Sequence, residues 1–169
     1  MTDANVFEPD FDEPTDRPGF TYRRARIGWQ AGGERLGASL FEVEPGNACF
    51  PLHWHSNNEE MLIVLSGQPS LRTPDGERVL DEGEVVAFPV GEAGAHQVVN
   101  RSDGTARFLI VSEMNAVDLN GYPDTGKVLA TNRAPGGRPV EGSKFLSFRE
   151  ADAVDYLDGE PTPSDTAPE

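Results

Sequence analysis

Short segments of alternating or apolar residues, separated by turns rich in glycine and proline, run through most of this chain of 169 residues. The turns recur roughly every 8–12 residues, which is typical of an all-β sandwich or barrel. No long helical period interrupts the pattern, and the length suits one domain with one core. The candidate strands lie at residues 24–30, 37–43, 49–55, 59–65, 68–73, 78–80, 85–88, 95–100 and 107–111.

The two ends of the chain differ in composition from its middle. Residues 1–18 hold six acids and one arginine, and residues 150–169 hold seven acids and no base. Segments with so much charge and so little apolar surface do not bury enough to fold on their own. We therefore expect an acidic disordered tail at 1–18, a barrel over 19–146 and a second disordered tail at 161–169.

One helix is expected after the barrel, over residues 147–160. Ser147 and Glu150 stand three residues apart, as in a capping box, in which each side chain accepts a backbone amide at the start of a helix. A rough apolar stripe follows, and Gly159 can end the helix.

The formal net charge of −15 bears on partners and surroundings. A negative field repels nucleic acid and anionic membranes, so neither is an expected partner. The chain has only two lysines, Lys127 and Lys144, against twelve arginines. An acidic, lysine-poor chain fits a high-salt cytoplasm, but two solvated acidic tails on an ordinary domain explain the charge equally well.

The sequence also indicates a location. Its longest apolar run, residues 61–65, is far shorter than the roughly 20 residues that span a bilayer. The first residues do not form a signal peptide, and the single cysteine, Cys49, has no partner for an internal disulfide. We expect a cytoplasmic protein.

Three histidines, His53, His55 and His96, and one glutamate carry the expected chemistry. In a strand, residues i and i+2 point to the same face, so the imidazoles of His53 and His55 can share one ion. Glu60 opens the next strand, and alternation places its carboxylate on the inward face. Imidazoles with one carboxylate suit iron, nickel, zinc or manganese.

These residues fall within two glycine-framed motifs that resemble the signature motifs of the cupin family. The motifs read Gly46-(x)6-His53-x-His55-(x)4-Glu60-(x)6-Gly67 and Gly83-(x)5-Pro89-x-Gly91-(x)4-His96-(x)3-Asn100. Six residues precede His53 where five are usual, and four precede His96 where two are usual. A turn at residues 92–94 can absorb the second insertion.

The resemblance implies a double-stranded β-helix, the cupin jelly-roll barrel. It implies that His53, His55, Glu60 and His96 bind one divalent transition metal: iron, manganese, zinc or nickel. Residues 121–128 (GYPDTGKV) and 154–160 (VDYLDGE) are similar to a group of small, stand-alone prokaryotic cupins, some of which carry sugar-phosphate isomerase labels. Membership of that group implies a homodimer.

Several residues near the motifs have two interpretations. Glu59 is expected to face solvent, with a role beside a histidine as the alternative. Cys49 is expected to be a small core residue, and lining the pocket is the alternative. The basic cluster Arg23-Arg24-x-Arg26 is expected to pair with surface acids, although it could instead receive a phosphate or a carboxylate.

The expected function is that of a metal-dependent enzyme acting on a small oxygenated substrate. The reaction would be of the isomerase or epimerase, decarboxylase or dioxygenase type, with the ion as Lewis acid. Glu60 or a metal-bound water is the expected base. The alternative is a non-enzymatic module that binds or senses a small molecule, because a fold alone does not determine function.

Overall fold

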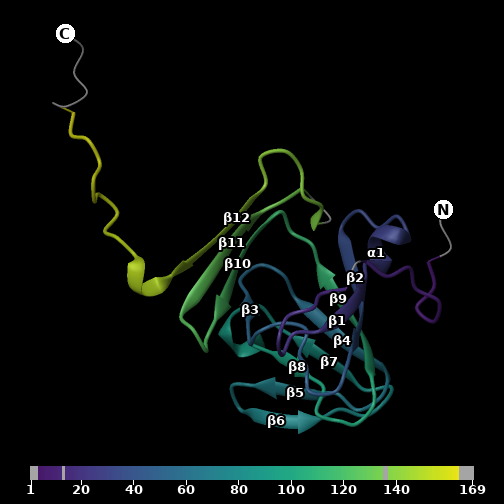
Figure 1. Ribbon diagram of the computed structural model, residues 1–169. Helices are drawn as coiled ribbons and strands as arrows, with labels where there is room; N and C mark the ends of the chain where they lie inside the picture. Colours follow the sequence, from purple (N-terminus) through teal and green to yellow (C-terminus); the bar gives the residue numbers. More distant parts are fainter. Residues whose placement is uncertain (1–3, 13, 135–136, 164–169) are drawn as a thin grey trace.

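The computed structural model of the protein describes residues 4–12, 14–134 and 137–163 (Figure 1). Short helical turns lie at α1 (Ile27–Gln30), η1 (Glu92–Gly94) and η3 (Glu150–Asp152). No helix in these ranges has the length and apolar character needed to cross a membrane. The strands are β1 (Tyr22–Ala25), β2 (Leu36–Val43), β3 (Trp54–His55), β4 (Glu60–Ser66), β5 (Ser70–Thr73), β6 (Gly76–Val79), β7 (Val85–Phe88), β8 (Gln97–Val99), β9 (Ala106–Glu113), β10 (Val117–Tyr122), β11 (Lys127–Asn132) and β12 (Lys144–Arg149).

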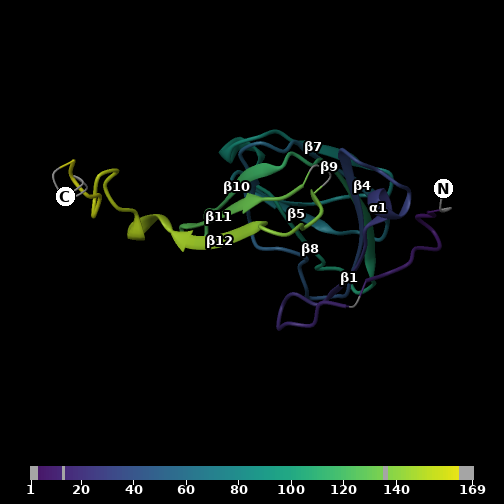
Figure 2. The same ribbon diagram turned by 90° about the horizontal axis from the view of Figure 1, so that it is seen from above.

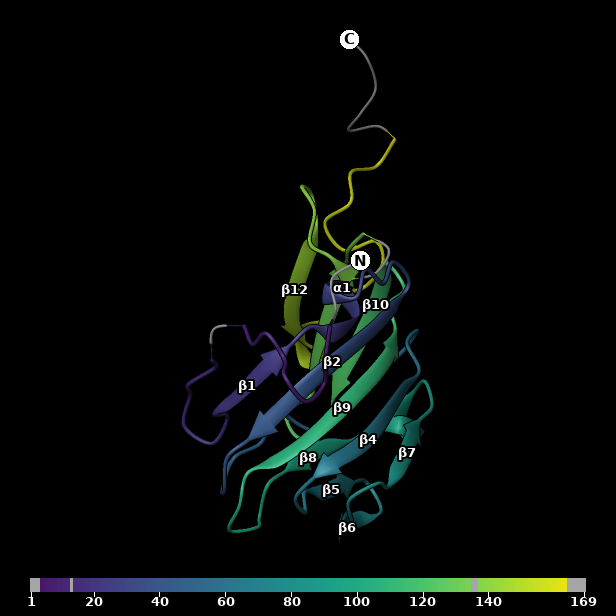
Figure 3. The same cartoon turned by 90° about the vertical axis from the view of Figure 1, so that its right-hand side faces the viewer.

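These strands pair antiparallel and form the two layers of a jelly roll. One layer is the sheet β1-β2-β9-β4-β7, whose strands lie side by side in Figure 3. The other layer contains the sheets β12-β11-β10-β3 and β6-β5-β8. An isolated antiparallel bridge between His53 and His96 joins these two smaller sheets. The all-β jelly-roll prediction is therefore confirmed.

Side-chain alternation along the strands builds the core between the layers. In β4, Leu62 and Val64 are fully buried, whereas Met61 is 41% exposed. Glu60 shares the parity of Leu62 and Val64, so the strand directs its carboxylate inward. The other large buried side chains of this core are Tyr22, Phe41, Val43, Leu71, Leu80, Phe88, Val98 and Phe108.

The N-terminal segment differs from the disordered tail expected over 1–18. Ala4, Val6 and Phe11 pack on a second apolar cluster that includes Ala25 and Leu40 of the five-stranded sheet. Backbone hydrogen bonds also join this segment to β1, at Asp12 and Thr15. Scattered apolar residues and an edge strand are enough to hold an acidic segment in place; residues 1–3 and 13 lie outside the described ranges.

The helix expected over 147–160 is wrong. Residues 144–149 instead form β12, which pairs with β11 over its whole length, with Ser147 opposite Leu129. Only η3 is helical, and beyond it the chain runs away from the barrel (Figures 1 and 2). Hydrogen bonds across a hairpin outweighed the local capping signal, because six residues of β12 found partners on β11. Of the tail expected at 161–169, residues 164–169 lie outside the described part.

Two candidate strands are shorter than expected. In the segment 24–30, the strand ends at Ala25 and α1 follows. In the segment 49–55, only Trp54 and His55 lie in a strand, β3, while His53 is held by its bridge. Both histidines nevertheless keep the same-face geometry expected for them, because their ring centroids lie 5.1 Å apart.

Candidate metal centre

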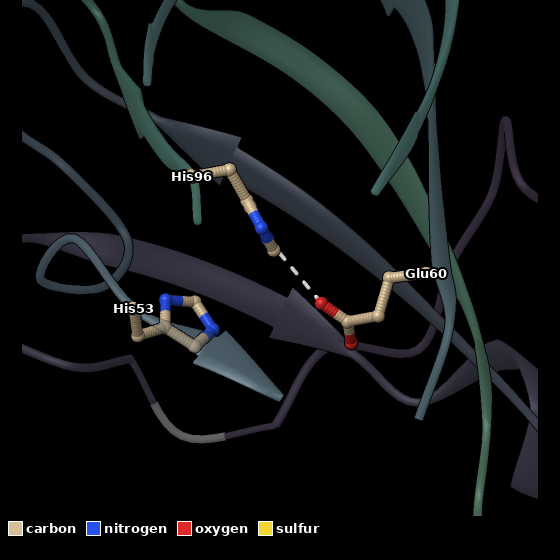
Figure 4. Close-up of side chains that lie close together, drawn as sticks. All are labelled: His53, Glu60 and His96. Atoms are coloured by element: carbon tan, nitrogen blue, oxygen red, sulfur yellow. Dashed lines mark ion pairs between the residues drawn. The ribbon is translucent and has the colours of Figure 1, made fainter. Parts of the chain in front are cut away.

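Backbone hydrogen bonds bring together one histidine from each of the two predicted motifs. The amide of His53 donates to the carbonyl of His96 at 3.2 Å, and the amide of His96 donates to the carbonyl of His53 at 2.9 Å. This pairing places both side chains beside β4, which carries Glu60. The ligand atoms of His53, Glu60 and His96 all lie within 4.8 Å of one another (Figure 4).

His55 completes the group at a slightly greater distance. Its Nε2 lies 3.5 Å from Oε2 of Glu60, and Nε2 of His96 lies 3.3 Å from the same oxygen. The structure therefore brings the three predicted histidine ligands around the carboxylate of the fourth, Glu60. Three of them, His53, Glu60 and His96, form the tighter cluster that could hold a metal ion.

Each imidazole is anchored through Nδ1 to an oxygen. Nδ1 of His53 lies 2.9 Å from the carbonyl of Pro51, and Nδ1 of His96 lies 2.9 Å from the carbonyl of Gly94. Nδ1 of His55 lies 2.6 Å from Oδ2 of Asp118. Carbonyl and carboxylate oxygens only accept, so Nδ1 carries a proton in each ring and Nε2 is the nitrogen left to bind an ion. Such bonds fix the tautomer and the orientation of metal-binding histidines.

Asp118 is the residue in this site that the sequence analysis missed. Its side chain is fully buried, and it accepts hydrogen bonds from Asn57 N at 3.0 Å and from Asn58 Nδ2 at 2.8 Å, as well as from His55. Asp118 lies in β10, sixty-three residues from His55. The only signal was the alternation of Asp118, Asn120 and Tyr122, which puts three polar side chains on one face of a strand.

Pairing between β3 and β10 sets this contact. Asn120 lies opposite His55 and Gly121 lies opposite Trp54. A Cβ on Gly121 would lie 2.2 Å from the Trp54 ring, so only glycine lets the indole cover this position. The indole faces away from the imidazoles, which leaves His55 directed toward Asp118 and Glu60.

At His53 and Glu60 the electrostatics favour the protonation states that metal binding needs. Burial, followed by the charges of His96 and His55, lowers the pKa of His53 to about 4. Burial alone would raise the pKa of Glu60, but the hydrogen bond from His96 and the charges of the histidines lower it to about 2. A neutral imidazole and an ionised carboxylate are the forms that bind a cation.

The pKa of His55 shifts in the opposite direction to that of His53. Burial alone would lower its pKa, but the hydrogen bond to Asp118 and the charge of Glu60 outweigh burial and raise it. The same contact with His55 lowers the pKa of Asp118, against the raising effect of its burial. The donor set as a whole, three Nε2 lone pairs and one carboxylate, fits a divalent transition metal.

A cavity of about 380 Å³ opens from this cluster. Tyr122 lies in its wall, with its ring stacked on His53 at a centroid distance of 6.1 Å, and burial raises its pKa. Cys49 also lines the cavity and is buried, so both interpretations of this residue hold. Burial raises the pKa of Cys49 to about 12, so its thiol stays protonated. Glu59 is exposed, as expected.

Comparison with known proteins agrees with this architecture. A family model for the cupin domain matches residues 39–112. No curated protein matches the chain significantly.

Solved structures resemble the chain over most of its length. One is a candidate sugar phosphate isomerase from Acidithiobacillus ferrooxidans, with 25% identity, a TM-score of 0.72 and coverage of 85% of this chain and 87% of that chain. Another is a cupin-superfamily sugar phosphate isomerase from Silicibacter pomeroyi, with 24% identity, a TM-score of 0.73 and coverage of 92% and 97%. The polyketide cyclase RemF from Streptomyces resistomycificus has 26% identity, a TM-score of 0.57 and coverage of 68% and 80%.

Proposed function

Because the chain is a member of the cupin superfamily, with its cupin domain over residues 39–112, we propose that it is a metal-dependent enzyme acting on a small oxygenated substrate. One observation carries the proposal: three imidazoles, each anchored through Nδ1, direct Nε2 toward an ionised glutamate. His53, His55, Glu60 and His96 would hold one ion of iron, manganese, zinc or nickel. Lewis-acid activation of a substrate oxygen is the chemistry that such an ion supplies.

The residues of the chain have distinct roles in this proposal. Asp118 and the carbonyls behind His53 and His96 hold the imidazoles in one tautomer, so the site is ready before an ion binds. Tyr122, whose raised pKa keeps its hydroxyl protonated, can donate a hydrogen bond to a substrate in the cavity. The lowered pKa of Glu60 suits a ligand better than a general base, since a base works best with a pKa near the operating pH.

The reaction type follows from the relatives only in part. The 25% identical protein from Acidithiobacillus ferrooxidans is described as a candidate sugar phosphate isomerase, which favours isomerase or epimerase chemistry. Decarboxylase and dioxygenase chemistry remain within the proposal, because the same ligand set accepts several metals.

Elemental analysis tests the proposal. Untagged protein purified without chelator is expected to hold near one transition-metal ion per chain. The Glu60→Gln variant and the His53→Ala, His55→Ala double variant are expected to hold less than about a tenth of that. The matched control is Glu59→Gln, which removes a neighbouring carboxylate that faces solvent and should leave the metal content unchanged.

The identity of the metal chooses the activity screen. Iron leads to oxygen-consumption assays with diketones and aromatic diols, and zinc, nickel or manganese leads to isomerase and decarboxylase assays. A wild-type protein that holds no metal after incubation with each of these ions would refute the proposal.

A second candidate function is a non-enzymatic cupin that binds or senses a small molecule. It is favoured by the scarcity of acid–base groups in the cavity: Cys49 and Tyr122 both have raised pKa values, and Glu60 is held ionised. The metal-loaded protein distinguishes the two functions. Turnover supports the enzyme, whereas a small molecule that binds and is released unchanged supports the binding module.

A further inference from the structure

The charged residues in the cavity wall contrast with the rest of the chain. The whole chain has a formal net charge of −15. The formally charged residues that line the cavity are Arg24, Arg26, Arg133 and Glu60, so three cations face one carboxylate. A positive pocket in a strongly negative protein needs an explanation, because guanidinium groups usually occupy exposed positions or are paired.

The arginines come from both sides of the cavity. Arg24 lies in β1, at the edge of the five-stranded sheet, and Arg26 follows that strand. Arg133 follows β11, in the opposite layer, and β1 and β11 lie on the two sides of the view in Figure 1. Arg133 and His55 line the same cavity, and the charge of Arg133 opposes the rise in the pKa of His55.

Arg24 and Arg133 have an unsatisfied donor each. The Nε atoms of both side chains are buried and have no hydrogen-bond acceptor among the residues that the structure describes. The nearest acid to Arg24 is Asp12, whose Oδ2 lies 3.5 Å from Nε, beyond the usual length of an N–H···O bond. A buried N–H without an acceptor is costly, so such groups call for a missing partner.

The neighbouring arginines, in contrast, form ion pairs with carboxylates. Arg26 forms an ion pair with Asp12 and packs over the Trp29 ring at 4.9 Å. Arg23 points to the other face of β1 and pairs with Glu42 at 3.5 Å. Both follow the expectation that this cluster pairs with acids, whereas Arg24 does so only weakly.

We infer that Arg24 and Arg133 form an oxyanion subsite, which binds a carboxylate or phosphate group of the substrate. The planar guanidinium matches both groups because it donates parallel hydrogen bonds to two oxygens. A cavity of about 380 Å³ holds a small molecule whose anionic group meets the arginines and whose other oxygens meet the His–Glu cluster. The inference rests on the proposed function only for that second contact.

Calorimetric titration of the full-length protein tests the subsite. Inorganic phosphate and acetate are titrated at low ionic strength into metal-loaded protein and into chelator-treated protein. The chelator-treated arm isolates the arginines, since phosphate can also bind a metal directly. At least one of the two oxyanions is expected to bind both forms of the wild-type protein.

Three substitutions locate the binding. Arg24→Met and Arg133→Met are each expected to weaken oxyanion binding by about tenfold or more, because each removes charge-assisted hydrogen bonds. Arg133→Lys keeps the charge but loses the forked donor, so it should weaken binding less than Arg133→Met. The matched control is Arg23→Met, which removes the same charge one residue away and should change affinity by less than about twofold. Circular dichroism checks that each variant is folded.

The outcomes separate this inference from the proposed function. Failure of both oxyanions to bind chelator-treated wild-type protein would overturn the subsite, as would an equal loss in Arg23→Met and Arg24→Met. Arginine-dependent binding in a protein that takes up no metal would retain the subsite and refute the metal-dependent enzyme. Stronger binding of phosphate or of acetate identifies the anionic group.

Discussion

Two groups of residues around the cavity are built differently: the group around Asp118, called the inner end, and the pair Arg24 and Arg133, called the outer end. At the inner end, Asp118 accepts hydrogen bonds from Asn57, Asn58 and His55, so the polar groups behind the imidazole are satisfied within the chain. At the outer end, Arg24 and Arg133 each keep a buried Nε without an acceptor in the described part of the chain. The inner end is therefore complete as folded, whereas the outer end is completed by a ligand.

The largest expected effect comes from breaking the inner network. Asp118→Ala leaves several buried donors without an acceptor and is expected to lower the free energy of unfolding by about 3–5 kcal/mol. Urea unfolding of the metal-free protein measures this change. The control Asp124→Ala removes an exposed carboxylate paired with Arg72 and should cost less than about 1 kcal/mol. Equal losses of unfolding free energy in the two variants would show that the hydrogen bonds to Asp118 stabilise the protein no more than an exposed ion pair does.

Acid is expected to destabilise the metal-free protein by protonating groups at the inner end. The pKa of His53 is lowered to about 4, so between pH 6.5 and 4 the unfolded chain binds more protons than the folded one. Stability of the metal-free protein should therefore fall as the pH drops through this window, by an amount on the order of 3 kcal/mol at most. The pKa of His55 is raised, so its contribution is present at low pH and is lost as the pH rises, which partly offsets the fall.

Two variants separate these opposing contributions. Unfolding in urea at pH 7, 6, 5 and 4.5 should show a smaller fall for His53→Asn and a steeper fall for His55→Asn than for the wild type. Below pH 4.5, protonation of Glu60 and Asp118, whose pKa values are lowered, adds to the loss of stability in all three proteins. A fall in stability that is the same in the wild type and in His53→Asn would contradict the assignment of a buried neutral imidazole to His53.

A more conservative change at the same aspartate sharpens the role of the inner network. Asp118→Asn preserves the shape of the side chain but removes the charge that holds Nδ1–H of His55. Changes behind a ligand typically reduce metal affinity by about 10–100-fold, and that range is expected here. Competition with a chromogenic chelator measures the affinity. An unchanged affinity would mean that the charge of Asp118 does not support metal binding through His55.

The sequence predicted the fold and the grouping of the candidate ligand residues because both depend on short-range patterns. Strand alternation placed Glu60 inward, and the spacing of His53 and His55 in one motif and His96 in the other led to a shared site. It missed Asp118, because the pairing of β3 with β10 is set by packing between distant segments and not by a local signal. The expected helix failed for the same reason: residues 144–149 are better paired with β11 than left to their own propensity.

The smallest expected change in the free energy of unfolding comes from a substitution at the outer end, and the sign of this change distinguishes the two ends. Arg24→Met removes a buried donor that lacks an acceptor and leaves Asp12 paired with Arg26, so only the weak contact between Arg24 and Asp12 is lost. The free energy of unfolding without ligand should therefore stay within about 1 kcal/mol of the wild type or rise slightly, because the cost of the unpaired donor disappears. Thermal unfolding without and with inorganic phosphate measures the stability of the ligand-free protein and the stabilisation by the ligand. Phosphate should raise the melting temperature of the wild type more than that of the variant, since a ligand stabilises the state that binds it. A clear loss of stability in the absence of phosphate would mean that Arg24 is a structural residue, and the contrast between the two ends would fail.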